Sequence, residues 1–239
     1  MNLINTNTPS PTSPVQRGAG GGFLISAAAS NSGKTTLTIG LLRALCRRGL
    51  RVQPYKCGPD YIDPLFHRQA SGRTSVNLDT FMASDEHIRQ LYSQYGQEAD
   101  VRVVEGVMGL FDGYDKWHGS SAQLAQLLNL PVVLVVSAKS TAYSVAPLLY
   151  GFLHFNPSVH VAGVIFNQVA SSAHYNLLIQ AAEDAGVPCM GYLPRNPQLV
   201  IPGRHLGLTI STQQEMEELI NRAADEVDAH VELEKLLAL

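Results

Sequence analysis

The run from Ala28 to Thr36 reads AASNSGKTT and has the residue types of a phosphate-binding loop. It matches the pattern GxxxxGK followed by Ser or Thr, except that Ala28 stands in place of the first glycine, where a small residue still lets the turn close. Backbone N–H groups of such a loop and the positive end of the next helix bind phosphate, so we expect Lys34 to reach the β and γ phosphates and Thr35 to ligate Mg²⁺. The residues expected to contact nucleotide here are Ser30, Asn31, Ser32, Gly33, Lys34, Thr35 and Thr36. The loop therefore predicts a bound nucleoside triphosphate with Mg²⁺.

Two acidic segments could complement this loop. Asp60 and Asp63, in the run Lys56–Pro64, are three residues apart, so in a helical turn their carboxylates share a face and could hold Mg²⁺ or orient a cationic group. The other interpretation of this run is a proline-bounded turn with two solvated carboxylates. Glu105 ends an apolar run, a position from which metal is held beside a phosphate loop, and Asp112 lies in the glycine-rich loop that follows. The candidate metal ligands are Thr35, Asp60 and Glu105.

These residues must be positioned by an alternation of short apolar runs with stretches of helical pattern. The expected strands are Phe23–Ala27, Arg51–Gln53, Val101–Glu105, Val132–Val136, Val159–Phe166 and Cys189–Leu193. The expected helices are Lys34–Arg48, Ser84–Tyr95, Ser120–Leu128, Ala142–Phe155, Ser172–Ala185 and a last helix from Gln213 to the C-terminus. This alternation predicts an α/β fold with a doubly wound, mostly parallel sheet flanked by helices, whose ligands gather at the carboxyl ends of the strands. The candidate residues above fall at those ends.

The composition of the sequence indicates its domain organisation and excludes some classes of partner. Residues 1–22 are rich in Asn, Thr, Ser, Pro and Gly and are expected to form a flexible tail, and residues 23–239 are expected to form one domain. The net charge of −3 gives no global electrostatic case for nucleic acid or an anionic membrane. The three cysteines are dispersed, which disfavours a zinc site or a disulfide framework. The same dispersed cysteines make a reducing cytoplasm the simplest location. No apolar run reaches the roughly 18 residues of a membrane helix, so we expect neither a membrane span nor a signal peptide.

Longer motifs around these residues resemble the cobyrinic acid a,c-diamide synthase family in its N-terminal synthetase domain, within the dethiobiotin-synthetase-like P-loop NTPases. The motifs are the phosphate loop, KCGPDYIDP at 56–64, VEGVMGLFDG at 104–113, GYLPR at 191–195 and PGRHLGL at 202–208. The resemblance covers the chain from about residue 23 to its end. It implies an ATP-dependent carbon–nitrogen ligase of cobalamin biosynthesis, in which ATP phosphorylates the a- and c-acetate carboxylates of a corrinoid and ammonia then displaces phosphate to leave an amide.

The resemblance also implies roles for individual residues. Lys34, Asp60, Asp63 and Asp112 are the implied catalytic groups, with the three acids positioning metal or substrate carboxylate, and Glu105 is implied as a metal ligand. Similar folds place an Asn at the position of Asn167 to read the adenine edge, although a turn-forming Asn is the alternative. Pro194 and Arg195 are implied as the other wall of the base pocket.

The sequence departs from the family in one large way. Family members usually carry a second, glutaminase domain, and Cys46, Cys57 and Cys189 lack the flanking glycines that its nucleophile turn needs. We therefore expect a glutaminase domain or subunit to supply ammonia. The C-terminal helix is expected to be a covering helix or domain connector with an exposed apolar face, and similar folds suggest a homodimer.

Three alternatives remain open from the sequence. Dethiobiotin synthetase has a similar length but gives no reason for the segment Gly58–Pro64. A partitioning-type switch ATPase would carry an extra lysine where this chain has Ala29. A sibling amidoligase that acts on hydrogenobyrinic acid or another tetrapyrrole would share all of these motifs.

Overall fold

A computed structural model describes residues 21–201 and 212–239, and its centre is a parallel sheet. The strands are β1 (Gly21–Ala27), β2 (Val52–Cys57), β3 (Val76–Leu78), β4 (Val101–Glu105), β5 (Val132–Ser137), β6 (Val161–Val169) and β7 (Cys189–Pro194). Their order across the sheet is β3-β2-β4-β1-β5-β6-β7, and every pairing is parallel. Strand β1 lies in the middle, where the chain's progress across the sheet reverses. This switch point is where doubly wound sheets bind ligands at their carboxyl edge.

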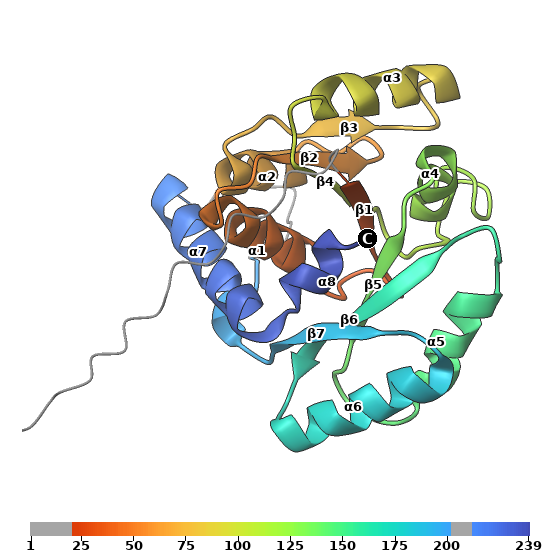
Figure 1. Cartoon of the computed structure of the whole chain (residues 1–239), viewed down its shortest axis with the longest axis vertical. Coiled ribbons are helices and arrows are strands. Elements are labelled where there is room, and N and C mark those ends of the chain that lie inside the picture. The colour runs from red at the N-terminus through yellow and green to blue at the C-terminus, as the bar shows by residue number, and fades with distance from the viewer. Residues whose placement is uncertain (1–20, 202–211) are drawn as a thin grey trace, which may run out of the picture.

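Helices cover both faces of the sheet (Figure 1). They are α1 (Lys34–Arg47), α2 (Asp63–Ser71), α3 (Asp85–Gly96), α4 (Ser121–Leu128), α5 (Val145–His154), α6 (Ser172–Ala185), α7 (Gln213–His230) and α8 (Leu233–Leu237), with a 3₁₀ turn, η1 (Pro197–Leu199). Helices α1, α2, α7 and α8 pack on one face, and α3 to α6 pack on the other. The predicted doubly wound fold is confirmed. No helix among these described residues is long and apolar enough to cross a bilayer.

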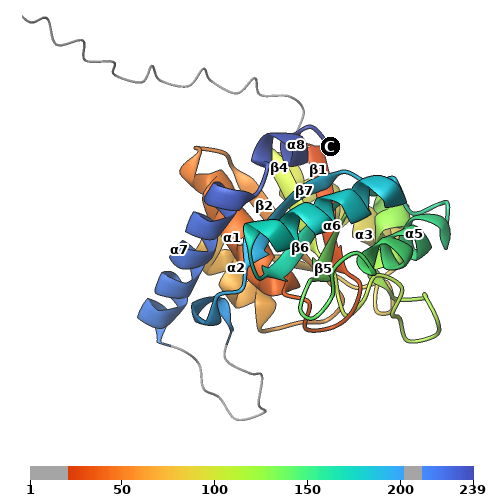
Figure 2. The ribbon, with the colours of Figure 1, turned by 90° about the horizontal axis from the view of Figure 1, so that it is seen from below.

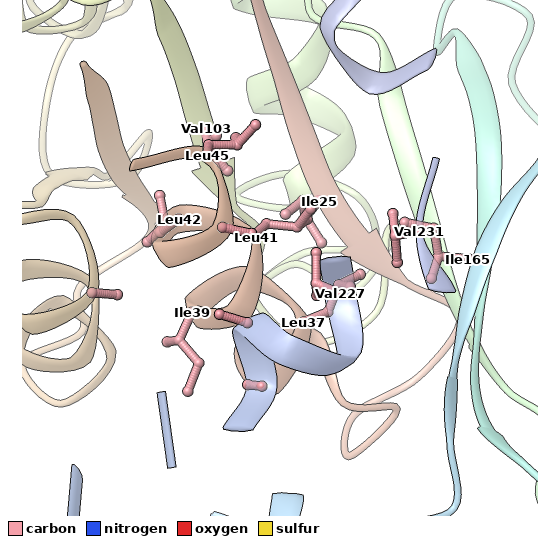
Figure 3. Packing of buried hydrophobic residues seen from close by; sticks show 14 of the residues in the cluster. Ile25, Leu37, Ile39, Leu41, Leu42, Leu45, Val103, Ile165, Val227 and Val231 are labelled. Atoms are coloured by element: carbon pink, nitrogen blue, oxygen red, sulfur yellow. The ribbon is translucent and has the colours of Figure 1, made fainter. Parts of the chain in front are cut away.

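Helix α1 carries the phosphate loop at its N-terminus and is fixed by an apolar interface on two sides. Leu37, Leu41 and Leu45 are fully buried between the sheet and α7, as Figure 3 shows for the cluster around Ile25. Helix α7 lies along α1 in both ribbon views (Figure 2), and Gly40 permits this approach because a Cβ there would lie 2.7 Å from the Ala223 carbonyl oxygen. Burying each leucine stabilises the fold by roughly 1.5–3 kcal/mol, so the loop's helix is held rigidly.

The structure corrects several predicted boundaries in the first half of the domain. Strand β1 begins at Gly21 rather than Phe23. Strand β2 runs past Pro54 to Cys57. Proline has no N–H to donate, but Pro54 pairs only with β4, because β3 pairs with β2 only from Tyr55 onward.

The sequence interpretation missed β3 and α2 entirely. Helix α2 begins at Asp63 with proline in its first turn, and it ends at Ser71, followed by the capping residue Gly72 with φ 72°.

The last predicted helix is two helices. The chain leaves the helical conformation at Val231, which forms an antiparallel bridge with Gly191 of β7, and the Glu232 N–H donates to the Met190 carbonyl at 2.9 Å. The apolar face of α7 is buried against α1 and is not exposed as expected. The motif at 202–208 and most of the expected N-terminal tail lie outside the described residues.

Candidate active site

The phosphate loop between β1 and α1 has the backbone conformation that anion binding needs. Gly33 has φ 95° and precedes α1 as its N-cap residue, without a side-chain cap, so the loop leads directly into the positive end of the helix. A side chain at Gly33 would overlap the amide of Asn167. Asn31 also has a positive φ of 61°, and the Ser32 hydroxyl donates to the Ala29 carbonyl at 2.8 Å, which closes the turn. The local geometry agrees with the predicted phosphate loop.

A cavity of about 660 Å³ opens over this loop at the carboxyl edge of the sheet. It brings together most of the predicted site residues from segments far apart in the chain. Those that line it are Ser30, Asn31, Gly33, Lys34, Thr35, Thr36, Asp60, Asp63, Glu105, Asn167 and Pro194. Lys56, Met108, Gln168 and residues 196 and 199–201 also contribute to its wall. The cavity is therefore the place where nucleotide and acidic groups can meet.

Lys56 is the centre of the charged groups in this cavity, although the sequence interpretation assigned it no role. Its ammonium Nζ lies 2.7 Å from Asp63 Oδ2, 3.1 Å from Glu105 Oε1 and 3.9 Å from Asp60 Oδ2, and it donates to the Gly106 carbonyl at 3.0 Å. The lysine side chain is only 4% exposed. One buried cation thus lies among three carboxylates and offsets part of their mutual repulsion, which makes such a cluster more tolerable inside a protein.

The electrostatics of the cluster follow from this pairing. Burial favours the neutral form of Glu105, but the charge of Lys56 and the hydrogen bond from His67 outweigh it and hold the pKa of Glu105 well below its usual range. Burial also opposes the charge on Lys56, yet Glu105 and Asp63 raise its pKa above the ordinary value. Burial and the charge of Glu105 raise the pKa of Asp63, although Lys56 opposes this. Glu105 and Lys56 are therefore a charged pair at neutral pH.

Asp60 is held by the backbone of its own turn. Its Oδ1 accepts from the N–H groups of Ile62 at 2.8 Å and Asp63 at 3.1 Å. Burial would raise its pKa, but these two hydrogen bonds and Lys56 lower the pKa below its ordinary value. Asp60 thus offers a carboxylate fixed in place at the wall of the cavity.

The oxygen groups beside Thr35 fit a Mg²⁺ ion that binds together with nucleotide. The Thr35 hydroxyl donates to Glu105 Oε1 at 2.7 Å and lies 3.5 Å from Asp63 Oδ2. Within the described parts of the chain, no group of three or more His, Cys, Asp and Glu side chains could hold a metal by itself. Nucleotide-bound Mg²⁺ needs only one or two protein ligands, since phosphates and water complete its coordination. Thr35 and Glu105 have the right chemistry, and Asp63 lies beside the Thr35 hydroxyl. Asp60 as a metal ligand stays a prediction.

Other predicted residues have different surroundings. The Lys34 ammonium donates to the Met108 carbonyl, and Met108 has a positive φ of 45°. The Asn167 amide donates to the Ser32 carbonyl at 2.9 Å and accepts from the Gln168 N–H at 2.8 Å, so it braces the phosphate loop.

Three predicted residues do not line the cavity. Ser32 is buried behind the loop, and Arg195 is exposed. Asp112 accepts from the Gly109 N–H at 2.9 Å through Oδ2 and so holds the loop after β4. Roles for these residues in catalysis or nucleotide binding stay predictions.

Sequence reasoning missed His67 as well as Lys56. His67 lies outside the motifs of the sequence, but it is fully buried and its Nε2 lies 2.7 Å from Glu105 Oε2. A signal was present for each. Lys56 opens the motif that contains Asp60 and Asp63, and His67 follows Asp63 by four residues after a helix-opening proline.

Comparisons with known proteins identify the family to which the chain belongs. A family model described as "CobQ/CobB/MinD/ParA nucleotide binding domain" matches residues 23–208. "Cobyrinate a,c-diamide synthase" of Listeria monocytogenes is 45% identical over 224 residues, and "Hydrogenobyrinate a,c-diamide synthase" of Brucella ovis is 49% identical over 217 residues. These alignments cover 91% and 90% of this chain but 49% and 50% of the relatives, so the chain spans about half the length of the curated relatives that it matches.

Solved structures share the fold at low sequence identity. Chloroplast FtsY from Physcomitrella patens aligns with a TM-score of 0.54 and 16% identity, over 88% of this chain and 69% of that chain. The signal recognition particle 54 kDa protein from Aeropyrum pernix K1 aligns with a TM-score of 0.53 and 19% identity, over 86% and 49%. At this identity the likeness concerns the fold alone. The family match and the named relatives confirm the resemblance in the sequence, and the chain belongs to the CobQ/CobB/MinD/ParA nucleotide binding domain family.

Proposed function

We propose that this chain carries out the ATP-dependent amidation of the a- and c-acetate carboxylates of cobyrinic acid. The observation that carries the proposal is the cavity in which Lys56, Asp60 and Asp63 face the phosphate loop, since a bound carboxylate could there meet the terminal phosphate of ATP. The names of the relatives support the same reaction. The proposal would make the chain a carbon–nitrogen ligase of cobalamin biosynthesis.

The reaction has two steps whose atoms balance. A substrate carboxylate oxygen attacks the γ-phosphorus, and the bond from phosphorus to the β–γ bridging oxygen breaks. ADP departs, and the substrate now carries an acyl phosphate. Ammonia then attacks the carbonyl carbon, inorganic phosphate leaves, and the nitrogen loses a proton to give the amide. Catalysis of phosphoryl transfer rests mostly on positioning and charge stabilisation, which the loop N–H groups and Lys34 supply. Mg²⁺, held by Thr35 and Glu105, would neutralise phosphate charge when it is bound.

Asp60, Asp63 and Lys56 would together position the substrate carboxylate and the ammonium ion that supplies ammonia. A substrate carboxylate that approached Asp60 and Asp63 alone would be repelled by several kcal/mol at reduced dielectric. The Lys56 ammonium, 2.7 Å from Asp63, offsets this repulsion. Asp60, with its lowered pKa, stays charged and could hold ammonium before it loses a proton.

Ammonia would come from a glutaminase domain or subunit. Burial raises the pKa of all three thiols, and that of Cys57 lies at about 11, so none of them is a ready nucleophile for glutamine. We therefore expect the chain to use ammonium directly. A homodimer remains a prediction of the sequence resemblance, and a cytoplasmic location remains a prediction of the composition.

The choice of ring is tested together with the reaction. The cobyrinate and hydrogenobyrinate relatives are similarly close to this chain, so hydrogenobyrinic acid is the specific second candidate. The purified chain would be incubated with ATP, Mg²⁺ and ammonium chloride or glutamine, with each ring offered in turn, and products would be identified by mass spectrometry. We expect a diamide from cobyrinic acid with ammonium and none with glutamine. Amidation of hydrogenobyrinic acid alone would reassign the substrate, and no amide from either ring would refute the proposal.

A variant series links the activity to the cavity. Asp60→Asn should lower kcat more than it raises the KM for ATP, because the charge is needed at the acyl-phosphate and amine steps. Asp225→Asn, on the exposed side of α7, is the matched control. Asp112→Asn tests the predicted catalytic role of Asp112 in the same assay. Full activity of Asp60→Asn would contradict the role proposed for this acid.

A further inference from the structure

The Glu105 carboxylate is divided between two sets of partners. Its Oε1 accepts from the Thr35 hydroxyl at 2.7 Å and lies 3.1 Å from the Lys56 ammonium, on the side that faces the phosphate loop. Its Oε2 lies 2.7 Å from His67 Nε2, on the side that faces α2. A carboxylate can rotate about its last bond, so the partner of Oε2 fixes the plane of the group and with it the direction in which Oε1 points.

His67 is itself held in place from its other ring nitrogen. Its Nδ1 lies 3.0 Å from the Ser75 hydroxyl, and the imidazole is fully buried. A side chain with no exposed surface does not touch nucleotide or substrate, so any effect of His67 on the reaction passes through Glu105. The Ser75 contact leaves the ring with one orientation, in which Nε2 points to the carboxylate.

Helix α2 presents His67 and Asp63 on one face. The two residues are four apart in Asp63–Ser71, and their side chains reach two neighbouring strands: Asp63 contacts Lys56 of β2, and His67 contacts Glu105 of β4. Helix α2 therefore contacts both members of the buried charged pair, Lys56 and Glu105. This placement gives the short helix a role that the motif alone does not assign.

We propose that His67 is a positioning residue that orients Glu105 Oε1 toward the Thr35 hydroxyl, and thereby tightens the binding of the nucleotide-bound divalent cation. The inference rests on the proposed metal role of Glu105. Groups that orient a metal-binding carboxylate through its second oxygen typically change metal affinity about 10–100-fold when they are removed. The expected effect lies in metal affinity and not in the affinity for metal-free nucleotide.

Two amide variants separate orientation from mere packing. In His67→Gln the side-chain amide N can take the place of Nε2 and donate to Glu105, whereas in His67→Asn the shorter amide reaches only the Nδ1 side toward Ser75. Mn²⁺ would be titrated into protein saturated with a non-hydrolysable ATP analogue, with free Mn²⁺ measured by electron paramagnetic resonance. We expect His67→Asn to weaken Mn²⁺ binding about tenfold or more, and His67→Gln to retain most of the affinity. Affinity for the analogue without metal should match wild type in both.

Two further variants make the result decisive. His87→Leu, an exposed histidine on α3, controls for loss of a histidine, and Glu105→Gln reports the metal role on which the inference rests. If Glu105→Gln weakens Mn²⁺ binding while His67→Asn does not, the inference about His67 is overturned and the metal site stands. Equal losses in His67→Asn and His67→Gln would also overturn it, because a restored donor would then have no effect. Unchanged Mn²⁺ binding in Glu105→Gln would refute the metal role itself.

Discussion

Replacing Lys56 by methionine should destabilise the fold strongly, because it leaves buried carboxylates without their cation. Methionine keeps the unbranched apolar stem of lysine and lacks only the terminal ammonium, so the change removes mainly the charge. At an effective dielectric constant of about 20, attraction over 2.7 Å to Asp63 and 3.1 Å to Glu105 is about 5–6 kcal/mol for each pair. Desolvation of the ammonium offsets much of this, and removing one partner of a buried ion pair typically costs about 3–5 kcal/mol.

The loss can be measured as a shift in unfolding, in EDTA to exclude divalent cations. For a chain of this size, about 3–5 kcal/mol corresponds to a fall in Tm of roughly 6–20 °C. Urea unfolding of Lys56→Met, Glu105→Gln and the double variant gives a double-mutant cycle. We expect the double variant to be less destabilised than the sum of the singles, with a coupling of about 1–3 kcal/mol. A Lys56→Met protein within about 1 kcal/mol of wild type, or additive losses, would refute the charge-pair account.

Three further outcomes follow from the site and its supporting helices. Lys34→Ala should lower ATP-dependent turnover about a hundredfold or more with an unchanged circular dichroism spectrum, since a contact to the transferred phosphate is lost, and near-normal turnover would contradict the phosphate-loop assignment. Asn167→Ala should raise the KM for ATP, because its amide no longer braces the Ser32 carbonyl 2.9 Å away, and a changed preference among nucleotides would in addition support base reading. The hydrogen bond from Arg43 lowers the pKa of Glu217 from 4.5 to about 2, so its contribution is present above about pH 4.5 and is lost as pH falls toward 2. In urea unfolding, Glu217→Gln should therefore be less stable than wild type by no more than about 1 kcal/mol at pH 6 and equal to it near pH 2, whereas a constant difference would oppose the linkage.

The sequence by itself determined the features whose chemistry lies in contiguous residues. The phosphate loop could be predicted because Gly33, Lys34 and Thr35 act through local backbone geometry at the start of one helix. The parallel sheet could be predicted because buried strands and amphipathic helices alternate, and Glu105 could be singled out because an acid ends an apolar strand. These inferences needed no knowledge of how distant segments pair.

The tertiary structure alone decided which groups meet in the cavity. Lys56 contacts Glu105 because β2 and β4 pair in a register that sets these two residues side by side, and a register between strands 49 residues apart depends on packing that no local pattern encodes. Asp63 and His67 reach the same point because α2 forms, and this short helix is stabilised by contacts of Phe66 with the core more than by its own propensity. The fold also places Asp60 in the wall of the cavity, whereas Asp112 accepts a hydrogen bond from the Gly109 N–H. Composition and spacing could not distinguish these two acidic loops.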